Sequence, residues 1–215
     1  MNPASPHQGQ SVAMYGPALD DATSAMILVH GRGASAQGIL DLARHLTLTG
    51  MTYLAPQAAG HTWYPYSFLA PLEQNEPGKS SGLDVIGGLV GRLEDAGIPA
   101  ERIVLAGFSQ GACLASEFVA RNPRRYGGLI VFSGGLIGPP GMAFNLSGDL
   151  AGTPVFLGCS DVDAHIPLHR VEETATELAA MGARVTKKIY PGMPHTIVQD
   201  EIDEARRLMA ELLDA

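Results

Sequence analysis

Short apolar runs alternate along the chain with longer stretches in which apolar residues recur every three or four positions. Residues 25–29 form a continuous run rich in β-branched side chains, which is typical of a strand buried on both faces. Five further runs are predicted to be strands of the same kind, and residues 11–15 are predicted to form an antiparallel edge strand. The five runs are residues 51–55, 102–106, 128–132, 154–157 and 184–190.

The longer stretches carry one apolar face at helical spacing and are predicted to be amphipathic helices. Gly182 is expected to be a C-cap residue, and Asp200 an N-cap residue. Strand–helix alternation predicts an α/β fold, a mostly parallel sheet covered by helices on both faces. We expect one domain over residues 11–215 after a flexible tail over residues 1–10. The predicted helices are residues 36–48, 83–96, 112–121, 168–181 and 202–213.

Two segments interrupt this alternation. Residues 60–81 hold Trp63, Tyr64, Tyr66 and Phe68 among three prolines, and residues 134–152 are rich in Gly and Pro with several apolar side chains. Both segments follow predicted strands, so both should lie over the carboxyl edge of the sheet, where ligands of such folds bind. They are therefore candidates for the walls of a binding site.

Composition narrows the range of functions. A net charge of −8 over 215 residues argues against nucleic acid as a partner, because phosphate neutralisation needs Lys and Arg. No apolar run reaches the length of a membrane span, and the first ten residues lack the pattern of a secretory signal. Cys113 and Cys159 are too few for a disulfide framework, and we read them as buried small hydrophobes in a reducing cytoplasm.

The clearest chemical signal is G-x-S-x-G at residues 107–111, directly after a predicted buried strand and directly before a predicted helix. This context is that of a nucleophile elbow, in which a sharp turn lifts the serine oxygen above the sheet. The turn leaves no room for side chains two positions before and two positions after the serine, which explains Gly107 and Gly111. Ser109 is the predicted nucleophile. The alternative is a glycine-rich turn with an incidental serine.

A serine nucleophile needs a base and an acid, which follow it along the chain in this fold class. Three histidines qualify by position, and His195 is preferred because its loop follows the last strand and precedes the last helix. His169 begins a helix, and His165 precedes a rigid Ile-Pro pair but could line the site. In the loop after the fifth strand, Asp163 is preferred as the acid because it lies further out on the loop, and Asp161 is expected to cap the turn.

A carboxylate at this position would hold the imidazole tautomer and stabilise the imidazolium. Asp161, Asp163 and His165 could instead bind a metal, but no matching ligands are evident elsewhere in the sequence. The turn at residues 30–33 follows the first long buried strand, and we assign the main-chain N–H groups of Arg32 and Gln110 as oxyanion donors. His30 is interpreted as a packed, hydrogen-bonded residue that shapes this turn.

With His30-Gly31-Arg32-Gly33, the G-x-S-x-G motif, the Asp163 loop and Gly192-Met193-Pro194-His195 in order, the chain resembles the phospholipase/carboxylesterase family. The likeness runs from about Ala25 to the end of the chain. It implies an α/β-hydrolase fold without a large lid, no cofactor, and hydrolysis of carboxylic esters or thioesters. It also supports Asp163 over Asp161, and Trp63-Tyr64 resembles the aromatic pair near the family's acyl site.

Three positions depart from the family pattern: Arg32 replaces an apolar residue, Ala34-Ser35 replaces an acidic continuation, and Pro65 stands where Asp is common. These changes leave the triad intact and bear on which substrate is bound. We hypothesise that the Arg32 side chain contacts an anionic or polar part of the substrate. The predicted substrate-binding residues are Trp63, Tyr64, Phe68, Leu136 and Arg32.

The sequence thus predicts a cytoplasmic serine carboxylesterase acting on short- to medium-chain esters through an acyl-enzyme, with no metal and no stable membrane insertion. A thioesterase or lysophospholipase with the same triad is the nearest alternative. A non-catalytic ligand receptor of the same fold is a distant one, since such receptors usually lack a triad residue. The expected partner is a small ester or thioester, and a homodimer is compatible with the sequence.

Overall fold

A seven-stranded sheet forms the centre of the computed structural model, which describes residues 5–213. The strands lie in the order β1-β3-β2-β4-β5-β6-β7, and all neighbours are parallel except β1 and β3. This is the α/β-hydrolase architecture that the alternating pattern predicts, including the antiparallel edge strand. The strands are β1 Val12–Tyr15, β2 Ser24–Val29, β3 Met51–Pro56, β4 Ile103–Phe108, β5 Gly128–Phe132, β6 Pro154–Ser160 and β7 Arg184–Tyr190.

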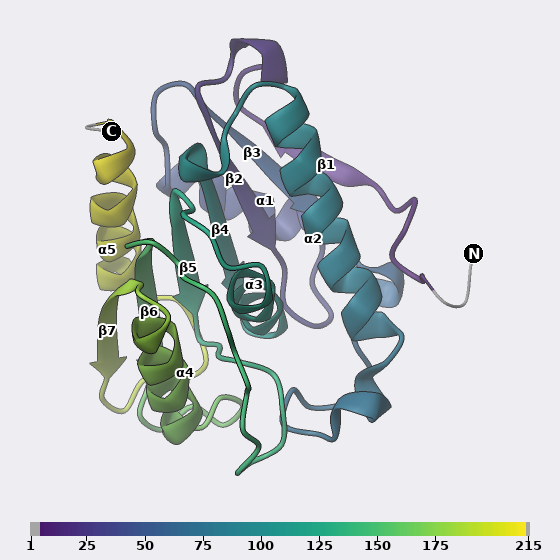
Figure 1. Cartoon of the computed structure of the whole chain (residues 1–215), viewed down its shortest axis with the longest axis vertical. Coiled ribbons are helices and arrows are strands. Elements are labelled where there is room, and N and C mark those ends of the chain that lie inside the picture. Colours follow the sequence, from purple (N-terminus) through teal and green to yellow (C-terminus); the bar gives the residue numbers. More distant parts are fainter. Residues whose placement is uncertain (1–4, 214–215) are drawn as a thin grey trace.

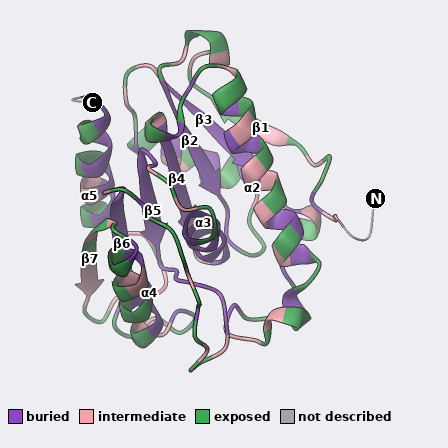
Figure 2. Ribbon diagram, viewed as in Figure 1, coloured by how far each residue is buried: buried purple, intermediate pink, exposed green. Residues whose placement is uncertain are grey.

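Helices cover both faces of the sheet (Figure 1). On one face lie α2 Gly78–Asp95, α3 Gln110–Arg121 and α4 Leu168–Ala180, and on the other lie α1 Ala36–Leu40 and α5 Gln199–Ala210. Successive strand residues point to opposite faces, so Ile27 packs into the first layer and Met26 into the second. The central strands are therefore buried along their whole length (Figure 2).

Local details differ from the predicted elements in several places. Helix α2 begins at Gly78, five residues before the predicted start at residue 83. The predicted helix over residues 36–48 is one short α-helix followed by a 3-10 helix, Asp41–His45, so its α-helical part ends at Leu40. Asp200 is not an N-cap residue, because α5 begins at Gln199 and its N-cap residue is Val198. The Glu201 carboxylate accepts a hydrogen bond from the Val198 N–H at 2.8 Å. The C-cap residue of α4 is Met181, and Gly182 follows it with φ of +82°, so the predicted glycine does end the helix but stands one position after the C-cap.

The first residues of the described chain are packed against the domain. Residues 1–4 of the expected tail lie outside the described residues, but His7 is buried. Its Nε2 lies 2.8 Å from the Trp63 carbonyl oxygen, its Nδ1 accepts from the Ala59 N–H, and its own N–H donates to Ser81 Oγ. The expected flexible tail is therefore ordered at His7, because these hydrogen bonds fix its imidazole beside the Trp63 indole ring.

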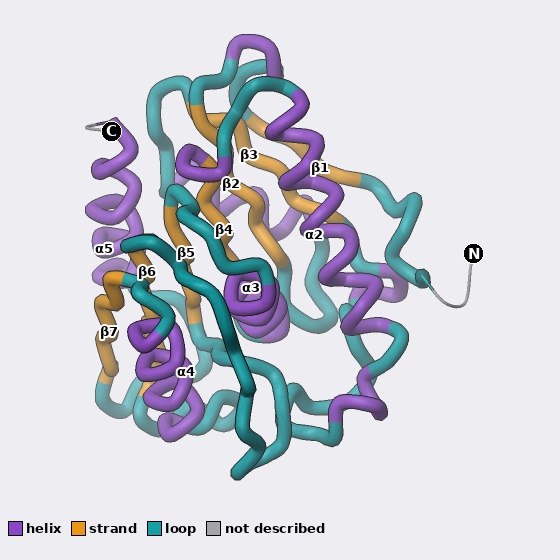
Figure 3. The backbone as a smooth tube through the Cα atoms, in the orientation of Figure 1, coloured by secondary structure: helices purple, strands orange, loops and turns teal. Residues whose placement is uncertain are grey.

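Loops gather at the edge where the parallel strands end, at the lower side of Figure 3. Residues 60–81 and 134–152 both reach this edge, as predicted from their position after strands. Among residues 5–213, no helix combines the length and the apolar character that crossing a membrane requires.

Candidate active site

Ser109 sits at a strained turn between β4 and α3. Its φ is +56° and its ψ is −121°, a conformation that non-glycine residues rarely adopt. A hydrogen bond from the Ser109 N–H to the Phe132 carbonyl, at 2.9 Å, holds the turn against β5. A Cβ on Gly107 would lie 2.5 Å from Gly111 C, and one on Gly111 would lie 2.0 Å from Val29 O. The two glycines are thus required by close backbone approach, as the elbow motif predicts.

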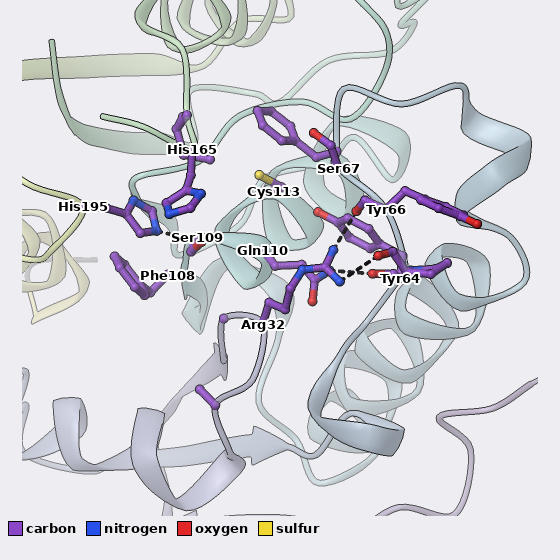
Figure 4. Close-up of a pocket in the computed structure, with 15 residues that line it drawn as sticks. Arg32, Tyr64, Tyr66, Ser67, Phe108, Ser109, Gln110, Cys113, His165 and His195 are labelled. Atoms are coloured by element: carbon purple, nitrogen blue, oxygen red, sulfur yellow. Dashed lines mark hydrogen bonds between the residues drawn. The ribbon is translucent and has the colours of Figure 1, made fainter. Parts of the chain in front are cut away.

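Three predicted site residues meet at the carboxyl edge of the sheet. His195 Nε2 lies 2.9 Å from Ser109 Oγ (Figure 4). On the other side of the ring, His195 Nδ1 lies 2.6 Å from Asp163 Oδ2. The side chain of Asp163 is fully buried, whereas that of His195 is 18% exposed. The imidazole therefore bridges a sheltered carboxylate and a hydroxyl at the wall of an open pocket.

Asp163 is held as an anion by its surroundings. Its Oδ1 accepts hydrogen bonds from the N–H groups of His165 and Ile166, at 2.8 and 3.0 Å. Burial opposes ionisation, but the His195 hydrogen bond and these two N–H donors outweigh it and keep the Asp163 pKa below its usual value. A charged carboxylate here fixes the proton on His195 Nδ1 and leaves Nε2 free to accept from Ser109.

Asp161, the competing acid in the sequence, contacts neither His195 nor Ser109. Its Oδ1 accepts a hydrogen bond from the Gly192 N–H at 2.7 Å, in the loop that carries His195. Gly192 has φ of +68°, which a residue with a side chain would adopt only with strain. Asp161 therefore ties the acid loop to the histidine loop.

A cavity of about 610 Å³ opens beside Ser109. Its walls come from the turn after β2, the aromatic loop over residues 64–68, the start of α3 and the two loops carrying Asp163 and His195. Most of the lining is apolar, with Tyr64, Phe68, Phe108, Cys113 and Ile166 among the residues. Of the predicted substrate-binding residues, Tyr64, Phe68 and Arg32 line this cavity.

Trp63 and Leu136 do not line the cavity, although both were predicted to bind substrate. Trp63 is completely buried beneath it, where the indole N–H donates to the His30 carbonyl oxygen at 2.9 Å. Leu136 is completely buried as well, because Arg170 and Thr174 on α4 hold its main chain. The segment over residues 134–152 packs on α3 and α4 and supplies none of the lining.

The residues of the two predicted oxyanion donors, Arg32 and Gln110, both line this cavity. The N–H of Gln110 belongs to the first residue of α3 and has no partner within the helix. In the described part of the chain, neither this N–H nor that of Arg32 donates to a main-chain carbonyl outside the regular elements. Both residues line the cavity next to Ser109, and their N–H groups remain the predicted oxyanion donors.

Two buried polar side chains shape this region. His30 is buried with a lowered pKa, because desolvation disfavours its charged form. Its Nδ1 lies 2.8 Å from the Gly31 carbonyl and its Nε2 accepts from the Ala58 N–H, so it is the structural residue that was expected. The Gln110 amide accepts from the Trp63 N–H and donates to the Tyr64 carbonyl, which joins the aromatic loop to α3.

The Arg32 side chain is anchored by the aromatic loop. Its Nη1 donates to Pro65 O at 2.9 Å and to Thr62 Oγ1 at 3.3 Å, and its Nη2 donates to Tyr66 O at 2.6 Å. The sequence departures at Arg32 and Pro65 are thus connected in space. Part of the guanidinium is committed to holding the loop, a role that the sequence reasoning did not include.

Sequence reasoning also missed several residues around Ser109. The Phe108 ring lies against the His195 imidazole with centroids 4.8 Å apart. His165, by contrast, was named from the sequence as a residue that could line the site, and it does line the cavity, edge-on to the same imidazole at 4.9 Å. Phe108 is the first variable position of G-x-S-x-G, and this position beside the nucleophile was a usable signal. Ile166 and Cys113 carry no such signal, because an apolar residue after a loop or within a helix is most often core.

Neither cysteine has the properties of a nucleophile. Burial raises the pKa of the Cys113 and Cys159 thiols to about 12, and the Asp163 charge adds to this effect at Cys159. Both cysteines are buried and unpaired, as predicted from their number.

The comparisons of the chain with known proteins agree with one another on its family. Residues 16–213 match the phospholipase/carboxylesterase family. The chain is 26% identical to acyl-protein thioesterase 1 of Gibberella zeae, over 95% of this chain and 97% of the relative. It is 28% identical to acyl-protein thioesterase 1 of Eremothecium gossypii, over 90% of each chain.

Solved structures agree with the sequence relatives. A phospholipase/carboxylesterase from Dyadobacter fermentans has a TM-score of 0.90 and 44% sequence identity, covering 94% of this chain and 97% of that one. Esterase PE8 has a TM-score of 0.78 and 25% identity, covering 94% of this chain and 99% of that one. The likeness to each of these two structures therefore covers 94% of this chain.

Proposed function

The chain belongs to the phospholipase/carboxylesterase family, and on this premise we propose that it is a serine carboxylesterase whose triad is Ser109, His195 and Asp163. Family membership makes it a hydrolase of the esterase or thioesterase type. The observation that carries the proposed triad is the continuous chain of contacts from Ser109 Oγ through the imidazole to Asp163, at 2.9 and 2.6 Å.

The first half of the reaction forms an acyl-enzyme. Ser109 Oγ attacks the substrate carbonyl carbon while its proton passes to His195 Nε2. The carbonyl oxygen becomes an anion held by the N–H groups of Arg32 and Gln110, and α3 points its positive end at the same place. The tetrahedral intermediate then collapses, and the proton on His195 goes to the departing alcohol.

The second half returns the enzyme to its starting state. A water molecule takes the place of the alcohol, gives its proton to His195 Nε2 and attacks the acyl carbon. The bond to Ser109 Oγ breaks, the proton returns to Ser109, and the free acid leaves. Throughout both halves Asp163 stabilises the imidazolium, because its charge faces Nδ1 from a buried position.

The shape of the cavity favours acyl groups of short to medium length. A volume of about 610 Å³ is in the range of small-molecule sites, and its walls around Phe68 and Ile166 are apolar. The cavity wall includes His195, whose side chain is 18% exposed. Water therefore reaches the acyl-enzyme, which the second half-reaction requires.

Thioester hydrolysis is the second candidate function. It is favoured by the similarity, over about nine-tenths of the chain or more, to two proteins named acyl-protein thioesterase 1. The same triad serves either bond, because the attacked atom is a carbonyl carbon in both cases and only the leaving group differs.

Kinetics on matched oxygen and sulfur esters test this proposal. We expect p-nitrophenyl acetate, butanoate and hexanoate to be hydrolysed with a higher kcat/KM than the palmitate ester, and the Ser109→Ala variant to be inactive on all of them. A thioester of the same butanoyl group decides between the two candidates by the ratio of the two kcat/KM values. Retention of activity in Ser109→Ala would reject the triad.

A further inference from the structure

Arg32 places a fixed positive charge at the wall of the active-site cavity. Its side chain is exposed to that cavity, and in the described part of the chain no Asp or Glu forms an ion pair with it. In a protein with net charge −8, an arginine without an acidic partner beside the nucleophile is a notable feature. The three hydrogen bonds to Thr62, Pro65 and Tyr66 prevent it from turning away into solvent.

These hydrogen bonds leave one side of the guanidinium unused. Arginine has five N–H donors, and both on Nη1 and one on Nη2 are occupied by the aromatic loop. The Nε–H and the second Nη2–H remain. Nε and Nη2 share one edge of the planar group, and this edge is a fork with which arginine can bind both oxygens of a carboxylate.

The Tyr64 hydroxyl is a second unused donor in the same region. Tyr64 is only 2% exposed, and its hydroxyl oxygen has no hydrogen-bond partner among the described residues. Arg32 Cζ lies 5.9 Å from the centre of the Tyr64 ring, so the two groups are neighbours. In Figure 4 the Tyr64 ring extends past the guanidinium toward the part of the cavity where Cys113 lies.

A buried hydroxyl without a partner is costly, unless a ligand supplies one. The neighbouring Cys113 thiol interacts with this hydroxyl, but a thiol is only a weak hydrogen-bonding group. The cavity is thus lined by apolar residues such as Phe68 and Ile166, and also by Arg32 and Tyr64, which together carry three free donors and one positive charge. Purely aliphatic acyl groups would leave these donors unpaired.

Resting on the proposed function, we propose that Arg32 and Tyr64 form a carboxylate-binding subsite, and that the preferred substrates are esters carrying a free carboxylate a few bonds from the scissile carbonyl. The Arg32 fork binds both carboxylate oxygens, and the Tyr64 hydroxyl donates to one of them. A monoester of a dicarboxylic acid has the required chemistry on its acyl side. A carboxylate on the alcohol side is the other source of the same group.

Two pairs of substrates distinguish these sources. The acyl-side pair is the 4-nitrophenyl monoester of adipic acid and 4-nitrophenyl hexanoate, which differ mainly in the terminal carboxylate. The alcohol-side pair is 4-acetoxybenzoate and 4-methylphenyl acetate. The measured quantity is the ratio of kcat/KM for the charged and the neutral member of each pair, with Ser109→Ala as the blank.

We expect the parent protein to favour the charged member of one pair by about tenfold or more, the range of a charge-assisted bidentate contact. Arg32→Met should lower that ratio to about one or below. Arg32→Lys should retain part of it, because the charge remains but the fork is lost. Tyr64→Phe removes only the hydroxyl and should lower the ratio several-fold. Arg92→Met, which removes the same charge in the last turn of α2, should leave the ratio unchanged.

Two other results would contradict the proposed carboxylate-binding subsite. A parent that favours the neutral member of both pairs contradicts it, and so does an Arg32→Met variant with the parent's ratio. If Arg32→Met does not fold because the aromatic loop is released, Tyr64→Phe and Arg32→Lys still decide the question. Failure of the proposed function is distinct, since all four esters would then resist hydrolysis by the parent.

Discussion

Asp161 accepts a hydrogen bond from the main-chain N–H of Gly192 at 2.7 Å, across 31 residues of sequence. This contact joins the loop that carries Asp163 to the loop that carries His195. The geometry of the imidazole thus depends on a carboxylate that never touches it. The arrangement explains why two aspartates stand so close together in the sequence.

Removing this tie should weaken activity without abolishing it. In Asp161→Ala the His195 loop loses one anchor, so we expect kcat to fall by about three- to tenfold with KM little changed. Asp161→Asn keeps an oxygen that accepts from Gly192 and should stay within about twofold of the parent. Steady-state kinetics on p-nitrophenyl acetate measure both. Equal activity of the Ala variant and the parent would contradict this role.

Asp163→Asn should have a much larger effect. The Asn side chain can still accept from the His165 and Ile166 N–H groups, but its amide nitrogen faces His195 Nδ1 and favours the tautomer with a proton on Nε2. The imidazole then cannot accept from Ser109, and kcat should drop by about 10⁴-fold. Thermal unfolding shows whether the fold is retained. A variant with more than a tenth of the parent's kcat would disprove the assignment of Asp163.

Glu201 gives a prediction about stability and pH. It is 2% exposed, its Oε1 has no partner among the described residues, and burial raises its pKa from 4.5 to about 7. Between pH 4.5 and about pH 7, the Glu201 carboxyl group is protonated in the folded protein and ionised in the unfolded chain. The free energy of unfolding therefore falls as pH rises through this window, by roughly 3 kcal/mol from this group alone.

Glu201→Gln removes the charge that must be buried. We expect the variant to be more stable than the parent at pH 8 and to approach it near pH 4, where the parent's carboxyl is neutral. Urea unfolding at both pH values measures the difference in free energy between the two proteins. A difference that does not change with pH would show that Glu201 does not titrate in this window.

Gly111→Ala tests the close packing of the elbow. The added Cβ would lie 2.0 Å from the Val29 carbonyl oxygen, which is main chain and cannot move aside, so the variant should lose at least about 4 kcal/mol of stability or fail to fold. Gly88→Ala is the matched control. That glycine is exposed within α2 with nothing near its Cβ position, and alanine there should stabilise by about 1 kcal/mol. Similar chemical denaturation curves for the two variants would contradict the packing argument.

Much of the fold and the meeting of Ser109, His195 and Asp163 could be predicted from the sequence. Buried parallel strands are continuous apolar runs, and all their carboxyl ends lie at one edge, so loops after strands must meet there. The position of Ser109 followed from the two glycines that the turn requires. His195 and Asp163 followed from their places after the last two strands.

The roles of Trp63, Leu136 and the Arg32 side chain could not be predicted in the same way. An apolar residue in a loop has the same pattern whether it lines a cavity or fills the layer beneath it. Trp63 is buried because its indole N–H donates a hydrogen bond to the His30 carbonyl oxygen. Leu136 is buried because Arg170 donates a hydrogen bond to its main-chain carbonyl oxygen. Arg32 donates a hydrogen bond to Pro65 in a loop some 30 residues further along the chain. A contact over that separation cannot be predicted from the residues around Arg32.

Covalent labelling of the intact protein tests the central claim most directly. A fluorophosphonate probe reacts with a serine that a neighbouring base activates, and the mass of the protein then rises by one phosphonyl group. We predict a single adduct on Ser109, none in Ser109→Ala, and strongly slowed labelling in His195→Gln. An unlabelled parent protein, or an adduct that persists in Ser109→Ala, would contradict the proposed mechanism.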